Sequence, residues 1–172
     1  MRTRFIAALL VVVAMVAAAC TTESTSDTAG SPSTTESSEA AGTDGQAQVS
    51  GFEVKEVAVG DRALLLAIAD SPTLRAQGLM GVTDLGELDG MLFYWRHEAS
   101  GGFWMKDTLI PLDIVWFDVD GNFVGRASML PCSADPCETY SPGLDIDYRL
   151  AVEANPGDLD WISEDTVVVY SD

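Results

Sequence analysis

The residues Leu112-Asp-Ile-Val-Trp-Phe-Asp-Val119, followed by Asp120-Gly121, carry the clearest structural signal in this chain. The run is rich in β-branched and aromatic side chains, which favour a β-strand that is at least half buried. Asp-Gly is a strong signal for a tight hairpin turn. The chain then returns from Asn122 to Met129. The segment therefore predicts two antiparallel strands that meet at Gly121.

Similar apolar runs lie on both sides of this hairpin. Phe52–Val59 and Arg62–Ala69 flank Gly60-Asp61, so they read as a second hairpin. Further strands are expected at 90–95, 103–106, 147–154 and 166–170. About eight short strands with regularly spaced turn signals indicate a mainly β fold, a compact sandwich or barrel.

One short helical insertion follows the second strand. Ser71 is suited to cap a helix and Pro72 to occupy its first position. Thr73–Gln77 would fill the helix, and Gly78 would end it.

The N-terminus has the pattern of a secretory signal. Arg2 and Arg4 precede the apolar run Phe5–Ala19, and small residues lead to Cys20. A cysteine in this place resembles the lipobox of bacterial lipoproteins, although Ala17 stands where Leu is usual. We expect residues 1–19 to be removed and Cys20 to be lipidated. Cleavage as an ordinary secreted protein and an uncleaved signal anchor are the alternatives.

The signal is followed by a polar tether and then by one domain. Residues 21–48 hold 13 Ser or Thr and five acidic residues, with no Lys, Arg or aromatic residue. Such a composition predicts a disordered spacer, so residues 20–48 form the lipidated cysteine and its tether. Residues 49–172 have the length of a single β-rich domain.

The chain is strongly acidic, with a formal net charge of −18. Residues 49–172 contain 22 acidic and seven basic residues. Charge of this sign argues against nucleic acid as a partner and against electrostatic docking on anionic lipid. The signal pattern and Cys20 predict a location at the extracytoplasmic face of the cell membrane through the lipid anchor, or in the medium if Cys20 is not lipidated.

Cys132 and Cys137 form a close pair in Pro131-Cys-Ser-Ala-Asp-Pro-Cys137. In an oxidising compartment this pair predicts a structural disulfide, with a redox-active pair as the alternative. His97 is the sole histidine of the chain, and we expect no metal or cofactor. Asp118–Asn122 resembles a fragment of a calcium loop but lacks its full ligand spacing, and a hairpin tip explains it better.

Five sequence blocks occur in a characteristic order, at 76–81, 90–93, 103–114, 118–121 and 131–140. Together they resemble the Domain of Unknown Function 192 family over about residues 53–170. The resemblance implies an exported or lipid-anchored protein with a compact β-rich domain and a short helix, and it implies no activity. Val82 and Asp107 depart from the family pattern, which usually has Arg and Asn at these positions.

The candidate binding residues lie in and beside the densest of these blocks. We expect Trp104, Lys106, Asp107 and Asp113 to line one side of a cleft. An aromatic face with a few polar groups suits sugars or peptide-like ligands. In a second interpretation the two carboxylates beside Lys106 support acid–base chemistry. In a structural alternative, Asp113 accepts hydrogen bonds from loop backbone and Lys106 pairs with a carboxylate.

The sequence contains no recognisable nucleophile motif. A serine hydrolase would need His97 as its base, and Arg96–Gly102 reads as an exposed loop. The expected function is therefore binding of an envelope glycan, peptide or protein partner. The rival is a hydrolase of an envelope polymer or small ester that uses Asp107, Asp113, Lys106 or His97. A structural envelope protein without a ligand is the third interpretation.

Overall fold

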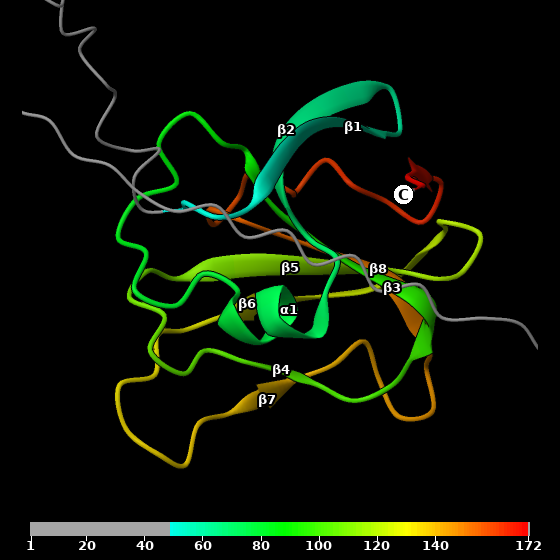
Figure 1. The fold of residues 1–172 in the computed structure, drawn as a ribbon. Helices are drawn as coiled ribbons and strands as arrows, with labels where there is room; N and C mark the ends of the chain where they lie inside the picture. The colour runs from blue at the N-terminus through cyan, green and yellow to red at the C-terminus, as the bar shows by residue number, and fades with distance from the viewer. Residues whose placement is uncertain (1–48, 172) are drawn as a thin grey trace, which may run out of the picture. The chain divides into compact units, whose positions relative to one another are not determined.

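The computed structural model describes residues 49–171 (Figure 1). The predicted signal peptide, Cys20 and the tether lie outside the described residues, so these predictions stay untested. Between residues 49 and 171 no helix combines the length and the apolar character that a membrane crossing requires.

The domain is mainly β, as predicted, with nine strands and one short helix among the described residues. Seven strands form one sheet in the order β6-β5-β8-β3-β2-β1-β9, and β4 pairs with β7 in a small second sheet (Figure 1). All strand pairs are antiparallel except β2 with β3. The strands are β1 Glu53–Val59, β2 Arg62–Ala69, β3 Gly90–Ala99, β4 Phe103–Trp104, β5 Leu112–Phe117, β6 Phe123–Met129, β7 Thr139–Tyr140, β8 Tyr148–Ala154 and β9 Val168–Val169.

Helix α1 (Pro72–Gln77) forms where the sequence predicts it. The Ser71 hydroxyl accepts a hydrogen bond from the Leu74 amide at 3.3 Å, and Gly78 ends the helix with a φ of 48°. Parallel strands require a crossover connection. Because β2 and β3 are parallel, α1 lies within the crossover that joins them.

The large sheet curls until its two ends nearly meet. Strand β9 pairs with β1, and the neighbouring residue Val167 forms a bridge to Asn122 at the start of β6. The Val168 amide donates to the Gly121 carbonyl at 2.9 Å. A Cβ atom on Gly121 would lie 2.1 Å from the Val168 carbonyl oxygen, so only glycine permits this approach. The predicted Asp-Gly turn therefore also helps to close the sheet.

Each face of the sheet carries its own core. Successive side chains of a strand point to opposite faces. Ile114 and Trp116 of β5 point to one side, called here the first face, while Val115 and Phe117 point to the second face. Residues 79–88 and Met105 cover the first face, and residues 159–168 cover the second.

Three elements differ from the sequence prediction. Strand β3 extends to Ala99, so Arg96 and His97 are strand residues rather than loop residues. Strand β4 ends at Trp104, and β7 was not predicted at all. Both are only two residues long, and a two-residue strand leaves too little alternation for a sequence pattern to detect.

Candidate functional site

A cavity of about 140 Å³ lies on the first face, between the end of α1 and strands β3, β4 and β8. A cavity of roughly this volume can hold a benzene-sized molecule. Its lining includes aromatic, acidic and basic side chains from segments far apart in the sequence, among them Arg75, Phe93, Trp95, Phe103, Tyr148 and Glu153.

Aromatic rings form most of the wall of this cavity. Phe103 meets Phe93 edge to face at 5.1 Å, and Trp95 meets Tyr148 in the same way at 5.2 Å. This mutual packing holds the four rings in fixed positions. Trp104 also lines the cavity and is 53% exposed, so its ring forms part of the rim.

Three buried polar side chains line the same cavity. Thr108, Tyr148 and Glu153 are 6%, 3% and 5% exposed. Within residues 49–171, none of these side chains has a hydrogen-bond or ion-pair partner in the protein. Their polar atoms are not among the fully enclosed, unpartnered atoms of the described residues, so they keep access to the cavity. Three polar groups that face one cavity without a protein partner can pair with a polar ligand.

Glu153 is the acid of this cavity. Burial raises its pKa from the ordinary 4.5 to about 8, so the carboxyl group is mainly neutral at pH 7 and can donate a hydrogen bond. Strand β3 approaches β8 closely beside it. A Cβ atom on Gly90 would lie 2.0 Å from the Glu153 carbonyl oxygen, so glycine is required there. The close strand contact holds the backbone of Glu153 in place.

Arg75 brings a positive charge to the edge of the cavity. Its Nη1 donates to the carbonyl oxygens of Asp70 at 2.7 Å and Tyr94 at 2.8 Å. Its guanidinium carbon lies 5.0 Å from the centre of the Trp95 ring. Desolvation lowers the pKa of Arg75 and the attraction of Asp70 opposes that shift, and an arginine stays charged under such a change.

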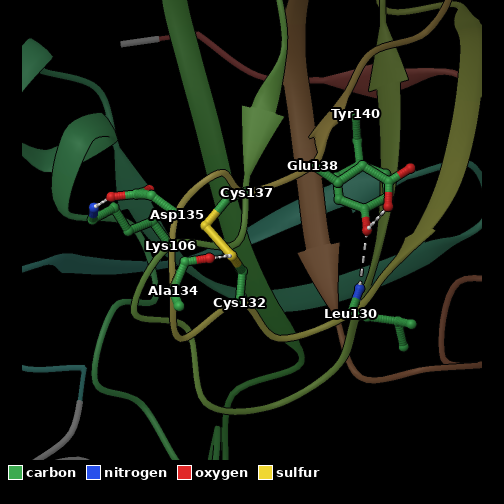
Figure 2. Close-up of a disulfide and its surroundings, with 8 residues drawn as sticks. All are labelled: Lys106, Leu130, Cys132, Ala134, Asp135, Cys137, Glu138 and Tyr140. Carbon is green, nitrogen blue, oxygen red and sulfur yellow. Dashed lines mark hydrogen bonds and ion pairs between the residues drawn. A yellow bond between two sulfur atoms is a disulfide. The ribbon is translucent and has the colours of Figure 1, made fainter.

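The structure places Asp113 apart from the other three predicted binding residues. Lys106 Nζ lies 5.8 Å from the centre of the Trp104 ring, although these two residues line different hollows. Trp104 lines the cavity described above. Lys106 and Asp107 line a different hollow of about 70 Å³ next to the disulfide. Lys106 forms an ion pair with Asp135, and that hydrogen bond raises the pKa of the lysine (Figure 2). Asp113 lies at neither place.

Asp113 lies in a third hollow, on the side of β5 opposite to Ile114. One carboxylate oxygen accepts a hydrogen bond from the Gly157 amide at 2.7 Å. Its other oxygen is buried without a partner among the described residues. The two contacts expected from the structural alternative, Asp113 with loop backbone and Lys106 with a carboxylate, are therefore both present.

The two departures from the family pattern have structural roles here. Asp107 has a φ of 55°, a conformation that Asp and Asn tolerate better than most residues. Its amide donates to the Cys132 carbonyl at 3.0 Å, and its carbonyl accepts from the Gly81 amide at 2.9 Å. Val82 is 2% exposed and belongs to the first-face core.

The structure contains the predicted disulfide between Cys132 and Cys137 (Figure 2). Cys132 holds the chain next to the cavity rim, because its amide donates to the Met105 carbonyl at 3.2 Å. Strand β7 follows the disulfide directly and pairs Thr139 with Trp104. The disulfide loop thus braces the segment that carries the rim tryptophan.

His97 is exposed and lines an open hollow of about 520 Å³. The carboxylate of Asp118 accepts from the amides of Asp120 and Asn122, both at 2.9 Å, which is the bonding of a hairpin tip. Across the described part of the chain, no three His, Cys, Asp or Glu side chains are grouped closely enough to hold a metal ion.

Sequence reasoning missed Thr108, Tyr148, Glu153 and Arg75. One signal was present for Glu153, which is the single charged residue of the run Leu150–Ala154. An acid inside a strand buried on both faces must either be paired or lie against a cavity. The other three residues have no comparable local signal.

Comparisons with known proteins place the chain in a family. The profile of DUF192, described as Uncharacterized ACR, matches residues 55–168. A protein of unknown function from Novosphingobium aromaticivorans is 26% identical, with a TM-score of 0.58 over 71% of this chain and 89% of that one. A proposed transcription regulator from Sinorhizobium meliloti is 22% identical, with a TM-score of 0.59 over 69% and 94%. A search among curated proteins finds no match. The chain belongs to the Domain of Unknown Function 192 family.

Proposed function

We propose that this domain binds a sugar ring of an envelope glycan in the first-face cavity. The observation that carries the proposal is the set of three buried, unpartnered polar side chains on an aromatic wall. A pyranose ring has an apolar C–H face and a rim of hydroxyl groups. The aromatic rings would cover the face, while Thr108, Tyr148 and Glu153 would pair with the hydroxyls.

Hydrolysis is the less favoured function for this cavity. Enzymes that cleave glycosides commonly use a pair of carboxyl groups on either side of the bond. Among the described residues that line the cavity, Glu153 is the one carboxyl group. Asp107 and Asp113, the acids that a hydrolase was expected to use, line other hollows.

We further propose that the domain works outside the cytoplasm, tethered through a lipid on Cys20. The apolar run, the cysteine and the acidic tether of the sequence support this location. Replacing Cys20 with Ser removes the acceptor of the lipid, so the protein should move from the membrane fraction to the soluble fraction. Continued retention of Cys20→Ser in washed membranes would contradict the lipid anchor.

A location outside the cytoplasm, as proposed here, argues against a role at DNA. One structural relative is nevertheless named as a proposed transcription regulator. The net charge of −18 makes the same argument, because contact with phosphates relies on Lys and Arg.

Sugar binding is testable through tryptophan fluorescence of the full-length protein. Trp95 and Trp104 line the cavity, so a sugar that stacks there should change their emission. The panel comprises N-acetylglucosamine, N-acetylmuramic acid, glucose, galactose and their uronic acids. Saturable binding that Trp104→Ala or Glu153→Ala weakens by about tenfold would support the proposal.

The matched control is Trp161→Ala, because Trp161 stacks with Arg62 and packs against the second-face core. It should leave sugar affinity unchanged. If no sugar of the panel binds, or if Trp161→Ala weakens binding as much as Trp104→Ala, the proposed function is wrong.

A further inference from the structure

Arg75 lies where two hollows adjoin. It lines the first-face cavity of about 140 Å³ and the open hollow of about 520 Å³, and Trp95 also lines both. A ligand seated in the cavity would therefore pass this guanidinium if it extended toward the open hollow.

The hydrogen bonds of Arg75 leave one edge of its guanidinium unused. An arginine has five N–H donors, one on Nε and two on each terminal nitrogen. Both recorded bonds, to the Asp70 and Tyr94 carbonyls, come from Nη1. Within the described range, Nε and Nη2 have no acceptor, and no carboxylate forms an ion pair with Arg75.

The unused edge has the geometry that a carboxylate requires. Nε and Nη2 present parallel N–H groups, which match the two oxygens of a carboxylate in a bidentate pair. The ring of Trp95 beneath the guanidinium and the two carbonyl bonds hold this edge in a fixed orientation. The pair would form in a partly desolvated place, where a charged hydrogen bond is stronger than in water.

The open hollow is less acidic than the rest of the domain. Arg75 and Arg96 line it together with Asp70 and Glu98, so its formal charge is zero with His97 neutral. Residues 49–172 contain 22 acidic and seven basic residues, so an anion meets less repulsion here than over the domain as a whole.

We propose that the ligand is an acidic sugar whose carboxylate is received by Nε and Nη2 of Arg75, at the junction of the cavity and the open hollow. This inference rests on the proposed sugar site and names its ligand class. Glu153, Tyr148 and Thr108 pair with hydroxyls inside the cavity, and Arg75 selects the charge at its edge.

The test compares acids with their own amides on the unaltered protein. Glucuronate and N-acetylmuramate are titrated calorimetrically into the full-length protein beside glucuronamide and the amide of N-acetylmuramic acid. Each acid should bind at least about tenfold more tightly than its amide, the usual difference for a charge-assisted pair. The preference should weaken as salt is added, since the site is partly exposed.

Variants of Arg75 then assign the preference to this residue. Arg75→Lys keeps the charge and removes the parallel N–H pair of the guanidinium, so the ratio of acid affinity to amide affinity should fall most of the way toward one. Arg126→Lys is the control, because Arg126 also bonds a backbone carbonyl and stacks on a ring, remote from both hollows. It should leave the preference intact.

The possible failures can be told apart. Equal affinity for acids and amides overturns the role of Arg75 and leaves the sugar site standing. A preference that Arg75→Lys retains overturns that role too. If neither acids nor amides bind, the sugar site itself is wrong. If Arg75→Lys does not fold, the acid–amide comparison on the unaltered protein decides.

Discussion

The two faces of the large sheet are built on different principles. The second-face core is formed by aliphatic and aromatic side chains, and it is sealed by Leu159, Ile162 and Val168 near the C-terminus. The first face also has an apolar core, but it contains a cavity with an unpaired acid, a hydroxyl and a phenol. The first face thus differs by its cavity, onto which three polar side chains open, whereas the unpartnered Asp113 Oδ1 and Tyr170 hydroxyl on the second side are enclosed.

This difference indicates that the functional site lies on the first face. Complete burial of apolar groups needs no further explanation. Polar side chains that open onto a cavity without a protein partner do, because most polar groups of a folded protein are paired. Four changes should affect the two faces differently, and the largest effect is expected from the phenylalanines of the cores.

Two phenylalanines offer a matched pair, one on each face. Phe117 is 0% exposed in the second-face core, and Phe93 is 3% exposed beside the cavity. Replacing either with Ala should lower the free energy of unfolding by roughly 3–5 kcal/mol, measured by chemical denaturation. Only Phe93→Ala should also weaken sugar binding.

If Phe117→Ala weakens sugar binding as much as Phe93→Ala does, the two faces are not functionally distinct. The corresponding Leu variants serve for the same comparison where the Ala variants fail to fold.

Glu153 makes the first face sensitive to pH. Its pKa is about 8 in the folded protein and near 4.5 when unfolded, so the folded state alone holds the proton between these values. Stability should therefore fall as pH rises from about 4.5 to about 8. Glu153→Gln keeps a neutral group at every pH, and by pH 9 it should be more stable than the natural chain by on the order of 4 kcal/mol.

Thermal unfolding of both proteins from pH 4 to pH 9 checks this prediction, because the pH dependence of all other groups cancels in the difference. Asp113→Asn is the control carboxyl on the opposite side of the sheet, and it should not reproduce the alkaline gain. A difference between Glu153→Gln and the natural chain that stays constant with pH would contradict the buried, unpaired acid.

The disulfide tests how the cavity rim is held. Replacing Cys132 and Cys137 together with Ser should cost about 2 kcal/mol, because the loop that they close is short. The loss should be local, since the loop braces residues 103–107. Hydrogen exchange should rise at Trp104 and Met105 while Val115 on the sheet stays protected. Equal loosening of both faces would show that the disulfide stabilises the whole domain.

Removal of the ion pair between Lys106 and Asp135 should have the smallest effect on stability and on sugar binding. Both side chains are substantially exposed, at 34% and 59%, and exposed pairs contribute little to stability. Lys106→Ala should leave the melting temperature and the sugar affinity nearly unchanged. If Lys106→Ala lowers the sugar affinity as much as Trp104→Ala does, Lys106 contributes to the binding site.

Much of the fold could be predicted because its signals are local. Partial alternation marked β1, apolar runs marked β2, β5 and β8, and the sequence Asp120-Gly121 marked the hairpin. The spacing of Cys132 and Cys137 indicated their bond. The candidate site was predicted less well, because Trp104 lines the cavity while Asp113 faces the other side of the sheet. A one-residue change of position along a strand reverses the face that a side chain occupies.

The sequence by itself determined the mainly β class, the capped helix, the hairpin turns and the cysteine pair, because each depends on the chemistry of a few adjacent residues. Only the tertiary structure decided that Arg75, Thr108, Tyr148 and Glu153 line one cavity. They come from α1, from a loop and from β8, which pairing in the sheet and packing on its first face bring together. The properties of this site, burial without a partner and a raised pKa, exist only after that packing has excluded water.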